Sequence, residues 1–265
     1  MKTIYFIKRL LLIAFMATQL FACQTKQKSS ASKETPSKEN DIRAAEELEE
    51  DSWQSLFDGK TKNGWHVYNN KSDGSAWEVT SDGVLHLNPK EILITPVQGA
   101  GDLSRAAKGG DLATDEEYDN FHLKLEFKVK DPSNSGIMMF VQEVPEHDYP
   151  WQTGPEIQIM HHRECSEEDN NCVGDLYGLI AGPRDIQISE DWNSIEIISE
   201  DETLEVIMNG RKLYKTKMWD DNWRAMIAKT KFTFWPDFAT FKKGKIVLQD
   251  HGHPVWYRNI KIKRL

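Results

Sequence analysis

Residues 121–130 show the most regular alternation of hydrophobic and polar positions in the chain. Phe, Leu and Val occupy every second position from Phe121 to Val129, and His, Lys and Glu occupy the positions between them. A period of two places the apolar side chains on one face of a β-strand and the polar side chains on the other. The segment is therefore predicted to be a strand with one dry and one wet face, as in an antiparallel sandwich.

Shorter segments of the same kind are separated by turn residues. Strands are predicted at 77–79, 84–87, 137–141, 155–160, 192–198, 204–208, 211–214, 246–251 and 255–262. The pairs Asp82-Gly83 and Asn209-Gly210 mark tight turns between neighbouring strands. Only 221–229 is predicted to be helical, and long interruptions fall at 96–110, 143–155, 163–173 and 216–243. This pattern predicts an all-β sandwich of two antiparallel sheets with long rim loops.

The first 23 residues have the pattern of a bacterial lipoprotein signal. Three basic residues precede an apolar run at 10–21, which is too short to span a bilayer and leads into Ala22-Cys23. This order predicts a lipid on Cys23, with attachment to the membrane through the lipid alone, in the periplasm or at the outer membrane. An ordinary secretory signal with an unmodified cysteine is the alternative.

Residues 24–51 are rich in Lys, Ser, Glu and Thr and contain no aromatic side chain. Such a segment cannot bury enough apolar surface to fold, so it is predicted to be a flexible tether. The folded domain is then predicted to cover 52–265. Its net charge counts against nucleic acid as a partner, because the whole chain has 42 acidic and 33 basic residues and a charge of −9. No basic stripe with interleaved aromatic residues is evident along the sequence.

Two cysteines, Cys165 and Cys172, remain downstream of Cys23. In an exported protein a close pair of cysteines is more often a disulfide than a metal site. The acidic run 167–169 between them offers calcium ligands as an alternative, and His161-His162 offers a second place for a divalent cation. Adjacent strand residues point to opposite faces, which disfavours two histidines on one ion.

Two predicted strands carry polar side chains where a core strand would be apolar. A period of two places Glu156 and Gln158 on one face of 155–160, and Gln249 and His251 on one face of 246–251. A carboxylate and amides side by side suit hydrogen bonding to sugar hydroxyls. A Glu and a His can also exchange protons near neutral pH. The alternative is a plain solvated face.

Short blocks of residues occur in a fixed order between 52 and 265. They are Leu56-Phe57-Asp58-Gly59, Gly110-Asp111-Leu112, Asn134-Ser135-Gly136-Ile137, Glu156-Ile157-Gln158-Ile159, Leu176-Tyr177-Gly178, Asp191-Trp192-Asn193, Leu248-Gln249-Asp250-His251-Gly252 and Arg258-Asn259-Ile260. In this order the chain resembles the 3-keto-disaccharide hydrolase family. The resemblance implies a concanavalin A-like (jelly-roll) fold. One departure is His161, which stands where the family often has an Asp.

The resemblance also implies a substrate class, namely glycosides and disaccharides already oxidised to a ketone at C3. A base removes the acidified C2 proton, the aglycone leaves from C1, and water adds back. Glu156 and His251 are the catalytic candidates implied here. The chain has no nucleotide fingerprint, so a separate sugar oxidoreductase must make the ketone. No cofactor is assigned, and a divalent cation stays an open alternative.

The remaining candidates are substrate-binding residues. They are Gln158, Gln249, Asn134, Arg258, Tyr177 and Trp151, with Trp235 as a second aromatic platform. Two roles are open for Arg258: stabilisation of an enolate, or a structural ion pair with Asp250. Ordinary two-carboxylate hydrolysis is disfavoured, because the neighbours of Glu156 on its own strand face are Gln158 and Met160. The competing function is a non-catalytic glycan-binding module of the same fold.

Overall fold

The computed structural model describes residues 52–90, 108–161 and 165–265. The predicted signal peptide, the lipid site Cys23 and the tether 24–51 lie outside these residues, as does His162. In the part of the chain that is described, no helix is both long and apolar enough to cross a membrane.

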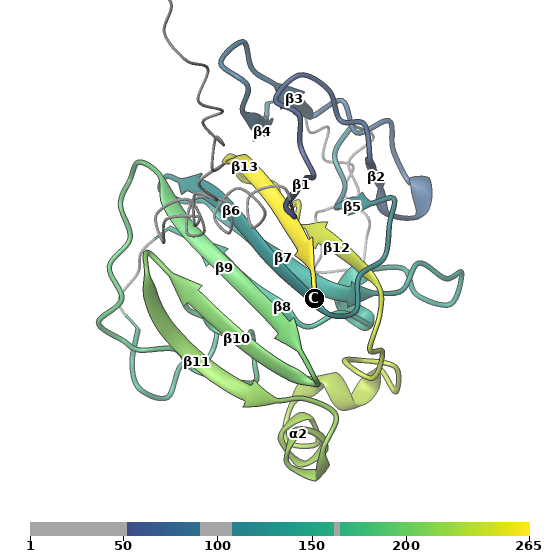
Figure 1. Ribbon diagram of the computed structural model, residues 1–265, viewed down its shortest axis with the longest axis vertical. Coiled ribbons are helices and arrows are strands. Elements are labelled where there is room, and N and C mark those ends of the chain that lie inside the picture. Colours follow the sequence, from purple (N-terminus) through teal and green to yellow (C-terminus); the bar gives the residue numbers. More distant parts are fainter. Residues whose placement is uncertain (1–51, 91–107, 162–164) are drawn as a thin grey trace, which may run out of the picture. The chain divides into compact units, whose positions relative to one another are not determined.

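Two antiparallel sheets form the fold (Figure 1). The larger sheet has the order β11-β10-β9-β6-β13-β4-β3, with β1 paired to β13. Its strands are β1 (Gln54–Ser55), β3 (Trp77–Val79), β4 (Leu85–Leu87), β6 (Phe121–Val129), β9 (Asn193–Glu200), β10 (Thr203–Met208), β11 (Arg211–Lys217) and β13 (Val255–Arg264).

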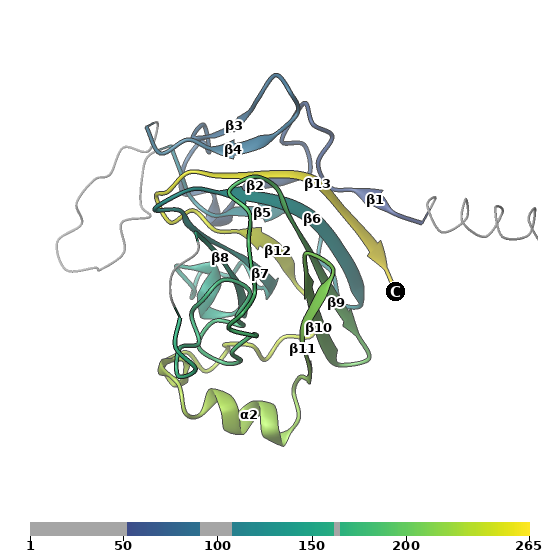
Figure 2. The ribbon, with the colours of Figure 1, turned by 90° about the vertical axis from the view of Figure 1, so that its left-hand side faces the viewer.

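The smaller sheet has the order β2-β5-β12-β7-β8 and lies behind the larger one in Figure 1. Its strands are β2 (Trp65–Val67), β5 (Leu112–Thr114), β7 (Asn134–Val141), β8 (Glu156–Met160) and β12 (Lys245–Leu248). Short helices occur in the connections: α2 (Asp221–Ile227) and the 3-10 helices Tyr68–Asn70, Pro150–Gln152 and Lys231–Phe234. Figure 2 shows α2 beyond the ends of β9, β10 and β11.

The core lies between the two sheets and follows the alternation predicted from the sequence. On β6 the residues Phe121, Leu123, Leu125, Phe127 and Val129 are at most 2% exposed. They belong to the same buried cluster as Ile137, Ile157, Ile159 and Leu248 of the smaller sheet. Burying one such side chain contributes about 1.5–3 kcal/mol of stability. The two-sheet antiparallel sandwich predicted from the sequence is thus confirmed.

The smaller sheet also covers a second, smaller apolar cluster on its outer face. Register pairs Val247 of β12 with Ala113 of β5 and with Met138 of β7, and these three are fully buried. They pack with Tyr68, Val141 and Trp151. Residues directly paired across strands share a face, and Met138 is paired with Glu156 of β8. The outer face therefore passes from an apolar patch to the polar residues of β8.

Two predicted segments differ from the structure at their ends. The strand predicted at 246–251 ends at Leu248, because Asp250 turns the chain there: its Oδ1 accepts from the Gly252 N–H at 2.8 Å. Gln249 and His251 therefore follow the strand. The predicted helix 221–229 is α2, which begins after Asp220, whose side chain accepts from the Trp223 N–H.

Candidate active site

A cavity of about 460 Å³ lies on the outer face of the smaller sheet, beside the apolar patch. Seven residues predicted from the sequence line it: Asn134, Trp151, Glu156, Gln158, Tyr177, Gln249 and His251. Trp235, the second predicted platform, lines it as well. The cavity thus joins residues from β7 and β8, the segment after β12, and three rim loops.

Glu156 is the buried acid of this cavity. It is the first residue of β8, is 8% exposed, and lies directly over Gly136 of β7. A Cβ atom at position 136 would stand 2.1 Å from Glu156 Oε1, so only a glycine leaves space for the carboxyl group. Burial raises the pKa of Glu156 to about 8, and the negative charge of Asp111 adds to this rise. The carboxyl group therefore keeps its proton at neutral pH and can act as an acid.

Gln249, just after the end of β12, reaches Glu156 across β7. Its side chain hydrogen-bonds the Glu156 carboxyl group, and its backbone N–H donates to the Gly136 carbonyl at 2.9 Å. Its Oε1 is buried and has no hydrogen-bond partner among the described residues. An unpaired buried acceptor costs free energy unless a donor reaches it. A substrate hydroxyl would supply that donor.

Gln158 and Asn134 form the second polar pair of the cavity. Gln158 lies two residues beyond Glu156 on β8 and is 4% exposed. Its Nε2 donates to Asn134 Oδ1 at 2.7 Å, which fixes both amides on the sheet. The pair offers further donors and acceptors to a polyhydroxyl ligand.

Asp111 is a functional candidate that the sequence pattern did not indicate. It lies directly before β5, is 9% exposed, and lines the cavity across the sheet from Glu156. Its Oδ1 accepts from the Asp250 N–H at 3.0 Å. It belongs to the Gly110-Asp111-Leu112 block but stands at a strand end, where alternation carries no information about its direction.

Asp250 also lines the cavity, but its carboxylate shapes the backbone. It is 1% exposed, and its Oδ2 accepts from the Gly110 N–H at 2.7 Å while its Oδ1 accepts from Gly252. These bonds tie the segment after β12 to the segment before β5. Asp250 thereby sets the spacing between Gln249 and Asp111.

A loop pairs with the outer edge of β8 and carries Tyr177 to the cavity. The Tyr177 N–H donates to the Glu156 carbonyl at 2.8 Å. Asp175 stabilises this loop from within: it is fully buried, and its carboxylate accepts from the Cys172 and Gly182 N–H groups. Arg184 lies 3.2 Å from it.

Aromatic side chains and one cation form the rim. Tyr149 stacks on Trp151 with ring centroids 5.3 Å apart, and Trp235 meets Trp151 edge-on at 4.6 Å. Lys231, which also lines the cavity, lies 4.7 Å from the ring centroid of Tyr177 and 3.2 Å from its hydroxyl oxygen. Lys231 lies in the long interruption 216–243, which has no pattern that singles it out. Its charge opposes the rise in the pKa of Glu156.

Of the two remaining predicted residues, His251 lies at the cavity and Arg258 does not. His251 is exposed where it lines the cavity, and its ring stacks on His253 with centroids 5.6 Å apart. Arg258 does not line the cavity. It lies on β13 of the larger sheet, directly opposite Glu126, and its Nε is 2.5 Å from Glu126 Oε2. The ion pair predicted with Asp250 is therefore made with Glu126, because β13 and β6 are neighbours.

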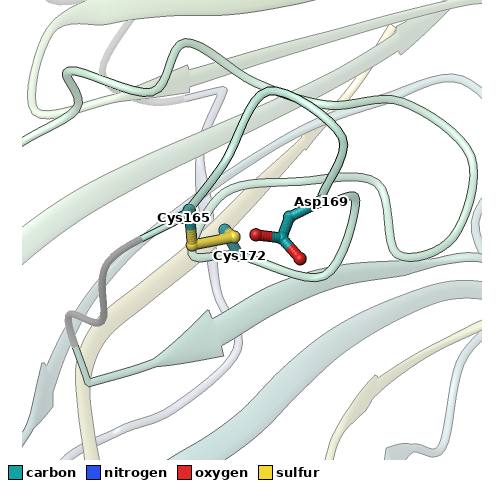
Figure 3. A group of neighbouring side chains, drawn as sticks. All are labelled: Cys165, Asp169 and Cys172. Atoms are coloured by element: carbon teal, nitrogen blue, oxygen red, sulfur yellow. A yellow bond between two sulfur atoms is a disulfide. The ribbon is translucent and has the colours of Figure 1, made fainter.

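Cys165 and Cys172 are joined in a disulfide (Figure 3). Asp169 of the enclosed loop lies beside the two sulfur atoms. Both sulfurs are bonded to each other, so this cluster offers no thiolate to a metal. Across 52–90, 108–161 and 165–265, no other group of three His, Cys, Asp or Glu ligand atoms lies close enough to share an ion. His161 lies 3.9 Å from Asp131, away from the cavity residues.

The chain is similar in sequence and fold to several known proteins. Over 92% of its length the chain is 28% identical to a curated Bacteroides thetaiotaomicron protein named 3-keto-disaccharide hydrolase, covering 91% of that protein. A crystal structure of a proposed glycosyl hydrolase from Parabacteroides distasonis matches with a TM-score of 0.69 and 30% identity, over 83% of this chain and 97% of that one. A second from the same organism matches with a TM-score of 0.55 and 26% identity, over 80% and 99%.

The family model described as the 3-keto-alpha-glucoside-1,2-lyase-like domain matches residues 52–263. This range contains every residue that lines the cavity. The chain therefore belongs to the 3-keto-alpha-glucoside-1,2-lyase-like family.

Proposed function

We propose that this protein is an enzyme that cleaves 3-keto-glycosides, including 3-keto-disaccharides. The family and the name of the Bacteroides relative support the substrate class. The observation that carries the proposal is Glu156, a buried carboxyl group with a pKa raised to about 8, in a cavity with an aromatic rim. A buried acid that keeps its proton at neutral pH is costly in a merely structural position.

The chemistry begins at the C3 ketone. It acidifies the proton on C2, and a base removes that proton to give an enolate. The C1–O bond then breaks, the leaving oxygen takes a proton, and the sugar becomes an unsaturated ketone. Water adds to C1 while C2 regains a proton, so the net result is hydrolysis. The site needs an acid near the leaving oxygen, a base near C2 and a positive group near the enolate oxygen.

Glu156 is assigned the role of the acid, because its proton is present at neutral pH. Since C1 and C2 are adjacent atoms, the base must lie close to the acid. Asp111 lines the same cavity, and its negative charge acts on Glu156 strongly enough to raise the pKa of that carboxyl group. His251 also lines the cavity but is exposed to solvent. We therefore assign the base to Asp111 and keep His251 as the alternative base.

Lys231 is assigned to the enolate. Its ammonium group lines the cavity and contacts the Tyr177 hydroxyl, so it supplies positive charge where the C3 oxygen becomes negative. Gln158, Asn134 and Gln249 would bind the sugar hydroxyls, and the Trp151 and Trp235 rings would stack on the apolar sugar face.

A non-catalytic glycan-binding module remains the competing function, since amides and an aromatic rim also suit a lectin. Turnover of a 3-keto-disaccharide beside the unoxidised disaccharide separates the two. We expect cleavage of the ketone alone, with exchange of the C2 proton in heavy water. Binding of both sugars without cleavage would establish the module, and equal cleavage of both would exclude elimination.

The cellular setting forms part of the same proposal. We propose that residues 1–23 direct export and lipid attachment at Cys23, that 24–51 tether the domain, and that 52–265 carry the activity. The protein would then work at the bacterial membrane, in the periplasm or at the outer membrane, after a separate oxidoreductase has made the ketone.

A further inference from the structure

The outer face of the larger sheet carries a band of positive charge. Lys124 and Lys128 lie on β6, and Lys130 directly follows that strand. The other members, Arg258, Lys261 and Lys263, lie on β13. Register places Lys124 directly opposite Lys261, and Arg258 next to the Lys128–Trp256 pair. We call these six residues the basic face. They stand out because the whole chain has a net charge of −9.

Three tryptophan rings support the basic face. Lys124 and Lys261 lie 5.1 and 5.2 Å from the ring centroid of Trp53. Cation–π contacts of this kind hold long cationic side chains in place above the ring. No such basic stripe with interleaved aromatic residues is evident along the sequence, because Trp53, Trp192 and Trp256 come from distant segments that meet only on the folded sheet.

The other two rings repeat this arrangement along the strands. Arg258 and Lys128 lie 4.0 and 4.9 Å from the ring of Trp192. Lys128 and Lys130 lie 5.3 and 5.7 Å from that of Trp256. Because the cations lie over the tryptophan rings, the basic face presents positive charge to a partner.

Half of the basic face lacks an acidic partner. Lys124 pairs with Glu196 at 3.1 Å, and Arg258 pairs with Glu126. Lys128, Lys130 and Lys261 form no ion pair with a carboxylate of the described residues. Their ammonium groups lie over tryptophan rings, and Lys128 acts on Asp82 only at longer range. These three ammonium groups can accept a negative partner without first breaking an ion pair.

A groove of about 610 Å³ lies at one end of the basic face. The residues that line it include Trp53, two basic residues (Lys124 and Lys261), three acidic residues (Asp58, Glu126 and Glu196) and Asn259. This lining combines both signs of charge with neutral hydrogen-bonding groups. It lies on the sheet opposite to the one that carries the catalytic cavity.

These features select one class of partner. Alternate residues on a strand repeat every ~6.6 Å. Lys128 and Lys130 are therefore one such step apart, whereas Glu126 lies between Lys124 and Lys128. This spacing suits an extended chain whose negative groups are separated by neutral ones. Duplex nucleic acid carries about one charge per 1.7 Å, so some of its phosphates would have to lie against the three carboxylates of the groove. A glycan with fewer charges can place its neutral sugars there. A flat lipid surface would not enter the groove. Sugar hydroxyls, in contrast, can donate to those carboxylates.

We propose that the basic face and its groove form a second binding site, for an acidic glycan whose sugars carry carboxylate or sulfate groups. The site is separate from the catalytic cavity, so binding there would hold a charged polysaccharide against the protein during turnover of smaller fragments.

The experiment measures binding of the full-length protein to polygalacturonate oligosaccharides, heparin oligosaccharides and neutral dextran. The site variant is the triple substitution Lys128→Gln, Lys130→Gln and Lys261→Gln. The control makes the same change of charge at Lys212, Lys215 and Lys242, which are paired with Glu205 and Glu202. Thermal unfolding confirms that both variants are folded.

We expect binding to at least one acidic glycan, weakened by added salt, and none to dextran. The site variant should lose about ten-fold or more in affinity, because three charge contacts disappear together, while the control stays within about two-fold of wild type. Turnover of a 3-keto-disaccharide should be unchanged in both. The proposal is overturned by absence of binding to both acidic glycans, by an equal loss in the control, by equal binding of dextran, or by stronger binding to anionic lipid vesicles or to nucleic acid.

Discussion

Replacing Glu156 with Gln is expected to make the protein more stable and less active, with the gain in stability rising with pH. The pKa of this buried carboxyl group is about 8 in the folded protein against 4.5 for the unperturbed group. Between these values the unfolded chain has lost the proton and the folded protein still holds it. Stability of the wild type therefore falls as pH rises, by about 1.4 kcal/mol per pH unit from this group.

This loss in the free energy of unfolding begins near pH 4.5 and levels off above about pH 8, where it amounts to roughly 4–5 kcal/mol. A Gln at position 156 has the same shape and no proton to lose, so this cost disappears. Near pH 5 the variant and the wild type should be about equally stable, and near pH 8.5 the variant should be more stable by several kcal/mol. Turnover should fall by about 10²–10⁴-fold, because the acid is gone.

Urea denaturation at pH 5, 7 and 8.5, followed by tryptophan fluorescence, measures the difference. Glu190→Gln, at an exposed position, is the matched control and should show no such trend. A difference between variant and wild type that does not change with pH would refute the assignment of a buried, protonated Glu156. A variant with full turnover would refute its role as the acid.

Four further changes have defined outcomes. Asp111→Asn removes the charge that raises the pKa of Glu156, so the basic limb of the pH–rate profile should move to lower pH. If Asp111 is the base, exchange of the C2 proton should vanish in this variant and survive in the Glu156 variant. Persistence of exchange in Asp111→Asn would return the base role to His251. Gly136→Ala places a Cβ 2.1 Å from Glu156 Oε1 and should cost about 1–3 kcal/mol of stability together with most of the activity; an intact kcat would contradict the close approach. Cys172→Ala opens the disulfide and should lower stability by about 2–3 kcal/mol in chemical denaturation, an effect that a reductant should reproduce in the wild type and not in the variant. Cys23→Ala should abolish metabolic labelling with a fatty acid, and equal labelling would exclude Cys23 as the lipid site.

The sequence predicted the sandwich because alternation is strong wherever one strand face is buried. Phe121 to Val129 shows this most clearly, since every second side chain enters the core. Glu156 and Gln158 were found for the same reason, as polar residues at positions where their strand faces a cavity. The local pattern was therefore enough to predict the side-chain direction of residues that lie within strands.

Residues at strand ends and in loops escaped this reasoning. Asp111 and Lys231 reach the cavity through backbone turns, and no period in the sequence gives the direction of their side chains. Arg258 was misplaced because its neighbour depends on strand order: β13 pairs with β6, which puts Glu126 opposite it. Strand order is a long-range property that a single sequence states only weakly.

The floor of the cavity draws its side chains from four strands or strand ends, at 111, 134–136, 156–158 and 249, which are held by one hydrogen-bonded register. A slip of one residue in any of these strands would turn its groups to the opposite face. The rim, by contrast, comes from the loops around 149–151 and 231–235, which can change length without altering the register. Exchange of these loops, with Lys231 kept, can therefore change which ligand the cavity accepts while Asp111, Glu156 and Gln249 stay in place. Grafting the two loops between relatives is the direct route to altered specificity.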